Sequence, residues 1–204
     1  MRRLLLPIAS GIALLLSGCS EQPAAPVKKV EEKLEPVTGQ TALFKTFQVA
    51  RSWDPHIQIL KLTSTHLNEV PEVRGKAAAW EGTFVSPTLG RSRTYTYSVI
   101  ELLPNLHKGV FSVGDEAFSV STGSPTPFLI EAAKIDTDKA YETALTKAGD
   151  YEKKNPGKLI TLVLEMTPRH PRPTWRVIWG ESAGTSSFSV FVDATTGEFL
   201  DVMH

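Results

Sequence analysis

The chain has 204 residues, with 22 lysines and arginines against 22 aspartates and glutamates, so its formal net charge is zero. A chain without a basic excess has no electrostatic reason to hold a polyanion, and we therefore expect no nucleic-acid partner. The length suits one domain or two small ones, and a hydrophobic share of 41% is enough to build a core.

The first residues predict an export signal. Arg2 and Arg3 precede an apolar run, Leu4–Leu16, which small residues follow. This is the layout of a secretory leader, and the run is shorter than the roughly 20 residues that a membrane-spanning helix needs. We therefore expect residues 1–18 to be a signal peptide.

The single cysteine of the chain comes directly after this leader. Cys19 ends the run Leu-Ser-Gly-Cys, which resembles the lipobox of bacterial lipoproteins. The resemblance implies that Cys19 is lipidated, which would anchor the protein to a membrane of the cell envelope on the periplasmic side. Ser20 follows the cysteine, and in the sorting pattern of such lipoproteins this favours the outer membrane over the inner one.

The segment after the cysteine predicts a flexible tether. Residues 19–40 contain Pro23, Pro26 and Pro36 together with a mixed-charge run, and they have few large apolar side chains. Such a segment cannot bury enough apolar surface to offset the entropy of its own ordering.

A first folded unit is predicted over residues 41–120. Apolar residues recur at helical spacing from Thr41, and Pro55 ends that pattern. Four segments with the alternation or composition of strands follow, at 57–65, 78–86, 93–101 and 108–113.

A second unit is predicted over residues 128–204, after a Gly- and Pro-rich connector at 121–127. Asp136 is the expected N-cap of a helix that runs to about Tyr151. Four further strands are expected at 158–166, 174–180, 187–193 and 198–202.

The two units have the same order of elements. Trp80 and Trp175 occupy corresponding places in the second strand of each, and the strand of Tyr95 corresponds to the strand of Phe188. The sequence therefore predicts an α+β fold of two tandem units, each one helix packed on a three- to four-stranded antiparallel sheet. Whether the units share one sheet is left open.

The second unit also contains a recognisable pattern. Trp175-Arg176-Val177, followed by the run from Phe188 to Leu200 with its Asp-Ala-Thr-Thr-Gly turn, resembles the PepSY domain over roughly residues 134–202. The resemblance implies a cystatin-like helix-on-sheet fold and a non-catalytic module that binds or restrains a protein partner. The first unit is a weaker match, because Pro104-Asn105 stands where the family has its Asp-x-x-Thr-Gly turn.

The turn itself has a structural explanation. The carboxylate of Asp193 can accept hydrogen bonds from the backbone of the turn, which Thr196 and Gly197 complete. Gly197 can adopt the positive φ that such a loop often needs. We therefore interpret Asp193, Thr196 and Gly197 as a folding signal.

The favoured function is a non-enzymatic, lipid-anchored interaction module of the cell envelope, one that modulates a peptidase or an envelope complex. Four arginines in turns form a candidate surface for an acidic partner: Arg91, Arg93, Arg169 and Arg172. No cofactor is expected. No metal is expected either, because the five histidines lack the spacing of a zinc site, and Met166 with His170 is a weak copper candidate.

Two alternatives stay open. Trp175 and Trp179 lie on one strand face and could line the cavity of a small-molecule carrier, although aromatic residues at this spacing more often form core. Ser182 lies in a Gly-x-Ser-x-Gly match, the motif of a hydrolase nucleophile. That motif requires a strand before it and a helix after it, whereas here a strand is predicted to follow.

Overall fold

The computed structural model describes residues 34–204, so the predicted signal peptide, Cys19 and most of the predicted tether lie outside the described residues. The described part forms one compact unit with both helices and strands. Its elements, in chain order, are β1 (Val37–Thr38), α1 (Gly39–Ala50), β2 (Gln58–Thr65), β3 (Lys76–Ala77), β4 (Ala79–Ser86), β5 (Arg91–Ser98), β6 (Gly109–Ala117), the short 3-10 helix η1 (Ile130–Ala132), α2 (Thr137–Lys154), β7 (Ile160–Glu165), β8 (Thr174–Trp179), β9 (Ser189–Asp193) and β10 (Phe199–Met203).

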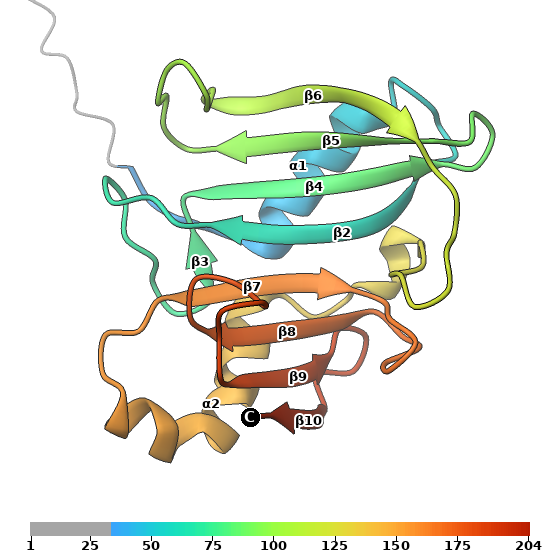
Figure 1. Ribbon diagram of the computed structural model, residues 1–204. Coiled ribbons are helices and arrows are strands. Elements are labelled where there is room, and N and C mark those ends of the chain that lie inside the picture. The colour runs from blue at the N-terminus through green and yellow to red at the C-terminus, as the bar shows by residue number, and fades with distance from the viewer. Residues whose placement is uncertain (1–33) are drawn as a thin grey trace, which may run out of the picture. The chain divides into compact units, whose positions relative to one another are not determined.

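Eight of the strands form one antiparallel sheet, in the order β10-β9-β8-β7-β2-β4-β5-β6 (Figure 1). The four strands of each half lie side by side, and the halves meet where β2 pairs with β7, with Leu62 opposite Leu164. The predicted α+β class is confirmed. The prediction of two tandem units is not confirmed. The strands of both halves belong to one continuous sheet, which answers the question that the sequence left open.

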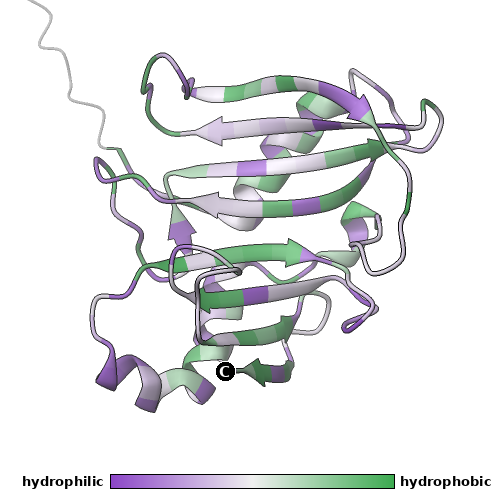
Figure 2. Cartoon of the chain, in the orientation of Figure 1, coloured by the Kyte–Doolittle hydropathy of each residue, from purple (hydrophilic) through white to green (hydrophobic). Residues whose placement is uncertain are grey.

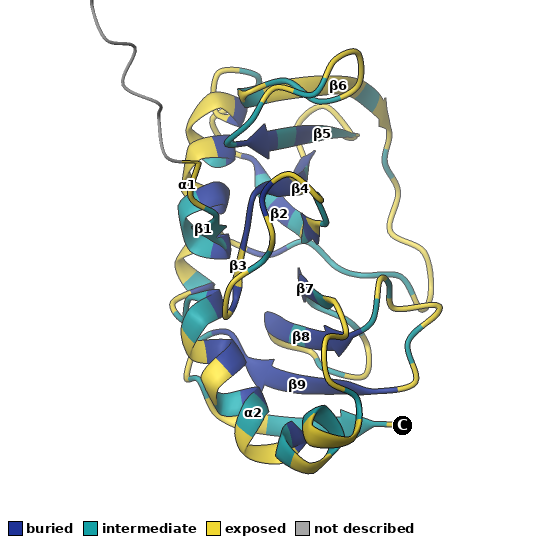
Figure 3. Ribbon diagram, turned by 90° about the vertical axis from the view of Figure 1, so that its left-hand side faces the viewer, coloured by how far each residue is buried: buried dark blue, intermediate teal, exposed yellow. Residues whose placement is uncertain are grey.

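Both helices lie on the same face of this sheet (Figure 3). Helix α1 packs on β4 and β5, and α2 packs on β8 and β9. The core fills the layer between the two helices and the sheet. Its largest members are the almost fully buried Trp80, Phe84, Trp175 and Trp179. These are the apolar sides of the alternating strand patterns, as the sequence predicts.

The two helices begin beside each other. Asp136 is the N-cap of α2, as predicted, and its Oδ1 accepts hydrogen bonds from Thr137 N at 2.7 Å and from Gln40 N at 2.9 Å. One carboxylate therefore satisfies free backbone donors of two helix N-termini at once. The first turn of α1 is thereby fixed to the first turn of α2.

Only a glycine fits at the start of α1. A Cβ on Gly39 would lie 2.6 Å from Thr137 Cγ2 and 2.7 Å from Trp175 Cη2, closer than carbon atoms approach in folded proteins. Gly39 N also donates to Thr137 Oγ1 at 2.8 Å. The end of the predicted tether is thus part of the folded unit: residues 37–38 form β1, which pairs with β3, and the helix begins at Gly39 instead of Thr41.

Most strand boundaries differ from the predictions by one or a few residues, and two of the larger differences have local reasons. Strand β5 ends at Ser98, whose Oγ donates to Ile100 O at 2.7 Å and accepts from Ile100 N at 3.1 Å, so the side chain turns the chain out of the ladder. Strand β6 continues past Gly114, where a positive φ and a shift in register mark a bulge.

The outer face of the sheet, which the helices leave free, differs between the halves. In β2, β4 and β5 it carries Lys61, Thr63, Glu81, Thr83, Thr94 and Thr96, all exposed or half-buried. In β7, β8 and β9 it carries buried residues instead: Thr161, Val163, Ile178, Ser189 and Phe191. Figure 2 shows that the strands themselves differ in hydropathy, counted over both faces, with β5 pale to purple and β7 and β9 largely green.

Within residues 34–204, neither helix combines the length and the apolar character needed to cross a bilayer.

Candidate functional site

Each of the four arginines predicted to grip an acidic partner has a carboxylate of this chain beside it. Arg91 and Arg93, in β5, pair with Asp115 in β6, at 2.5 Å and 3.5 Å. The hydrogen bond from Arg91 is the main reason that the pKa of Asp115 lies below its usual value. Arg91 and Arg93 therefore form a local ion-pair cluster at one end of the β5–β6 hairpin.

The other two arginines lie in the connection between β7 and β8. Arg169 pairs with Asp201 in β10, and Arg172 pairs with Asp193 at 3.2 Å. The structure therefore places the two arginine pairs in different halves of the sheet and does not join them into one patch. Their role in binding a partner remains a prediction.

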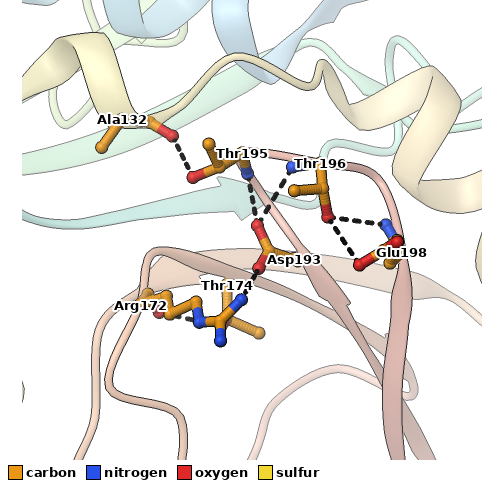
Figure 4. A network of polar contacts seen from close by, with 7 residues as sticks. All are labelled: Ala132, Arg172, Thr174, Asp193, Thr195, Thr196 and Glu198. Atoms are coloured by element: carbon orange, nitrogen blue, oxygen red, sulfur yellow. Dashed lines mark hydrogen bonds and ion pairs between the residues drawn. The ribbon is translucent and has the colours of Figure 1, made fainter.

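The turn after β9 has the hydrogen bonds that the sequence analysis expects (Figure 4). The buried carboxylate of Asp193 accepts from Thr195 N at 2.7 Å and from Thr196 N at 3.1 Å through Oδ1. Gly197 has a φ of 81°, and its N–H donates to Asp193 O at 2.8 Å. Arg172 offsets the buried negative charge from the other side of the carboxylate.

Ser182 does not have the surroundings of a hydrolase nucleophile. It lies in the loop between the antiparallel strands β8 and β9, and its hydroxyl is 2.9 Å from Thr185 Oγ1. A nucleophile elbow needs a strand that leads into a helix, so this geometry does not support a role in catalysis.

Trp175 and Trp179, the candidate lining of a carrier cavity, are part of the solid core. Each is 1% exposed. Trp175 Nε1 donates to Ile135 O at 2.7 Å, and the ring of Trp179 meets that of Phe188 edge-on with centroids 5.4 Å apart. Both side chains pack under α2, where the rings fill the space that a ligand would need.

No three histidine, cysteine or acidic residues in the part of the chain that the structure describes come together in a group that could hold a metal ion. His170, which forms the weak copper candidate with Met166, packs against the ring of Phe191, with centroids 4.5 Å apart. Burial lowers its pKa, and the charge of Arg169 adds to this effect.

The segment between β2 and β3 forms a site that the sequence analysis did not single out. Here His66 pairs through Nδ1 with the carboxylate of Glu72, and its Nε2 lies 2.7 Å from Thr161 Oγ1. Glu72 also accepts a hydrogen bond from Ile160 N at 3.2 Å. These contacts fix the segment to the beginning of β7, in the other half of the sheet.

The order hydroxyl, imidazole, carboxylate is that of a hydrolase triad, but here the three groups hold the segment in place and are not arranged for catalysis. Thr161 is 2% exposed, and its hydroxyl donates to Gly180 O at 2.6 Å. Since a hydroxyl has one proton to give, His66 cannot accept it and activate the oxygen as a nucleophile. Burial also lowers the pKa of His66.

Two adjoining clefts open beside this segment, and we call them together the hairpin cleft. The first has a volume of about 370 Å³ and the second of about 420 Å³. Both are lined by Arg74, Lys76 and Tyr141. Apolar residues of the first include Leu67, Pro71 and Leu159, and the second is bounded on the α2 side by Asp138, Glu142 and Glu152.

The hairpin that gives the cleft its name is a two-residue turn. Val73 and Lys76 exchange backbone hydrogen bonds of 3.1 Å and 3.0 Å around Arg74 and Gly75, both of which have positive φ. The Gly in Val-Arg-Gly-Lys is the one signal from which a sequence could have predicted this turn. The cleft also needs Tyr141 and Lys158, which the sequence places far from it.

Comparison with known proteins identifies the C-terminal half. A family model described as "Peptidase propeptide and YPEB domain" (PepSY) matches residues 134–203, which include α2 and all four strands from β7 to β10. This confirms the predicted PepSY domain in that half. No curated protein and no solved structure matches the chain. PepSY domains are often propeptides or regulatory modules of peptidases and are generally non-catalytic.

Proposed function

We propose that this chain is a lipid-anchored protein of the bacterial cell envelope that works without catalysis, by binding a protein partner such as a peptidase or another envelope complex. The observation that carries the proposal is the PepSY domain at residues 134–203. Domains of this family generally act on peptidases as propeptides or regulators, which is compatible with a role in protein interaction.

The geometry agrees with a binding role. The motif around Ser182 lies in a loop between antiparallel strands, and the triad-like group around His66 has its hydroxyl proton directed to a backbone carbonyl. Trp175 and Trp179, which could have lined a carrier cavity, are part of the core. What the described residues present to a partner is a cleft at the junction of the halves and a polar sheet face.

The anchor belongs to the same proposal. A lipidated Cys19 would hold the folded unit at a membrane surface, and Ser20 favours the outer membrane. More than one acyl chain is needed for stable anchoring, because a single chain binds a membrane only marginally.

We also infer that residues 41–120 are a diverged copy of the PepSY unit. Two features support this. Each half consists of a helix followed by four antiparallel strands that are consecutive in the sheet. Each has a fully buried tryptophan in the second of those strands, Trp80 and Trp175, and both rings approach Gly39.

The proposal is tested by cross-linking in intact cells with a lysine-reactive reagent, followed by mass spectrometry of the captured chain. We expect a specific adduct with a protein of the envelope, and acyl groups on Cys19. A Cys19→Ser variant is the matched control, since it should lose the acyl groups and the membrane association. Capture of no envelope protein by the wild-type chain would contradict the binding function.

A further inference from the structure

We propose that the hairpin cleft binds an acidic peptide segment of the partner, with a carboxylate of that segment held by Arg74 and Lys76. This inference rests on the proposed function and names the surface and the chemistry through which it would act.

Two positive charges at the hairpin cleft have no salt-bridge partner within residues 34–204. Among the described residues, neither the Arg74 guanidinium nor the Lys76 ammonium forms a salt bridge, whereas the four arginines considered earlier all do. The acidic residue nearest to Arg74 in the sequence, Glu72, already pairs with His66 and accepts from Ile160 N. Acidic side chains of α2 line the second cleft with the two cations, but among the described residues none of them forms a salt bridge with Arg74 or Lys76. An anionic ligand would supply the partner that these two exposed cations lack.

The backbone at Arg74 has an unfavourable conformation. Arg74 has a φ of 43° and is the one non-glycine residue of the described chain with positive φ. The first central position of such a two-residue turn favours Asn, Asp or Gly, and a bulkier residue there is strained by about 1 kcal/mol or more. Arginine is thus poorly suited to the turn, but at this position it lines both clefts.

The hairpin that carries Arg74 and Lys76 rests on α2. A Cβ on Gly75 would lie 2.4 Å from Thr137 O, so the turn is in direct contact with the first turn of α2. The hairpin continues into β3, which pairs with β1. Arg74 and Lys76 therefore start from a fixed backbone, which lowers the entropy lost when a ligand is bound.

The two clefts differ in the residues that form their walls. The first cleft has the size of a typical ligand pocket, about 300–1,000 Å³, and its apolar residues Leu67, Pro71 and Leu159 suit aliphatic neighbours of the carboxylate. On the other side of Arg74, the α2 wall carries Asp138, Glu142 and Glu152. These repel an anion, so a bound carboxylate would have to lie on the side of the first cleft.

The test uses two labelled peptides and the full chain, purified from its host in mild detergent. The probes are fluorescein-labelled Leu-Glu-Leu-Glu-Leu-amide and the same peptide with Gln in place of Glu, and binding is read from fluorescence anisotropy. We expect the Glu peptide to bind at least about tenfold more tightly than the Gln peptide, as for charge-assisted hydrogen bonds, and to weaken as salt is raised. Equal binding of both peptides, or no binding of the Glu peptide, would overturn the proposal.

Arg74→Asn separates binding from folding. Asn tolerates positive φ, so this variant should keep or raise the melting temperature while the Glu peptide binds about threefold to tenfold more weakly. Lys76→Gln should weaken binding similarly, and Lys61→Gln, which removes an exposed cation from the outer face of β2, should not. Unchanged binding by Arg74→Asn would overturn the proposal. If Arg74→Asn leaves peptide binding unchanged and still captures the partner in cells, the binding function is retained and only the assignment of this cleft is rejected.

Discussion

The two halves of the sheet share one architecture but differ in the burial of their outer faces. In the C-terminal half, Val163, Ile178 and Phe191 are buried on the side away from the helices. The connection between β7 and β8 folds back over that side, and His170 stacks on Phe191. In the N-terminal half the same side is lined by threonines with Lys61 and Glu81, which stay in contact with solvent.

This difference shows that the side chains on the outer face of a strand determine whether that face must be covered by a connection between strands. The outer face of the C-terminal strands carries large apolar side chains as well as polar ones such as Arg176, and these apolar side chains need cover on that face, as in sheets buried between two layers. The N-terminal strands β4 and β5 alternate between apolar and polar residues, so one layer of helix is sufficient. One half of the sheet thus has two covered faces, and the other keeps a polar face free.

The largest expected effect concerns the core that both halves share. Trp175→Ala should lower the free energy of unfolding by about 3–5 kcal/mol, because it removes a buried indole and its hydrogen bond to Ile135 O. Urea unfolding followed by circular dichroism measures this. Phe44→Ala on the exposed side of α1 is the control and should change stability little. Similar losses for both variants would contradict the assigned core.

The next prediction compares the outer faces directly. Phe191→Ala should destabilise the protein by about 3 kcal/mol, since it empties a covered site, whereas Thr96→Ala on the corresponding face of β5 should stay within about 0.5 kcal/mol. The same urea experiment measures both. Comparable effects at the two positions would show that the faces do not differ in burial as described.

A smaller effect is expected at the turn after β9. Asp193→Ala should cost about 1–3 kcal/mol, because two backbone N–H groups lose their acceptor and Arg172 loses its partner. Asp193→Asn keeps an acceptor oxygen and should recover part of the loss. Thermal melting of the two variants beside the wild type measures this. An Ala variant as stable as the wild type would remove the structural role of the turn.

The smallest effect is a pH dependence of the covered face. Burial and the charge of Arg169 hold the pKa of His170 below its ordinary value of 6.5, with Asp201 acting in the opposite direction. The unfolded chain therefore takes up this proton more readily, so stability is full above that value and declines as the pH falls through it. His170→Gln should flatten the decline in melting temperature between about pH 7 and pH 5. An unchanged profile would contradict this.

Much of the fold could be predicted because its signals are local. The alternation of Tyr95 and Tyr97 with threonines, and the cap at Asp136, depend on neighbours in the chain. The bulge at Gly114 and the early start of α1 could not, because the first depends on pairing with β5 and the second on contacts with Thr137 and Asp136. The joining of the halves through β2 and β7 is equally non-local.

The candidate site was less predictable than the fold. The turn residues Asp193 and Gly197 are close in sequence, so their geometry followed from the motif. The hairpin cleft, in contrast, combines Arg74 with Tyr141 and Lys158, which come together only when α2 and β7 pack beside the hairpin. Charge alone pointed to the turn arginines as the surface for an acidic partner. Their carboxylate partners within the chain are distant in sequence, so these ion pairs are visible only in the fold.

The claim that this protein works by binding a partner is tested most directly by photo-cross-linking in intact cells. A photoreactive amino acid would replace Leu159 at the rim of the hairpin cleft, and the same residue in place of exposed Lys147 on α2 would be the control. The account predicts one specific envelope protein joined at position 159 through an acidic peptide. The binding function would be contradicted if the photoreactive residue gave no adduct above the level found at position 147, whether it stood at position 159 or at other exposed positions.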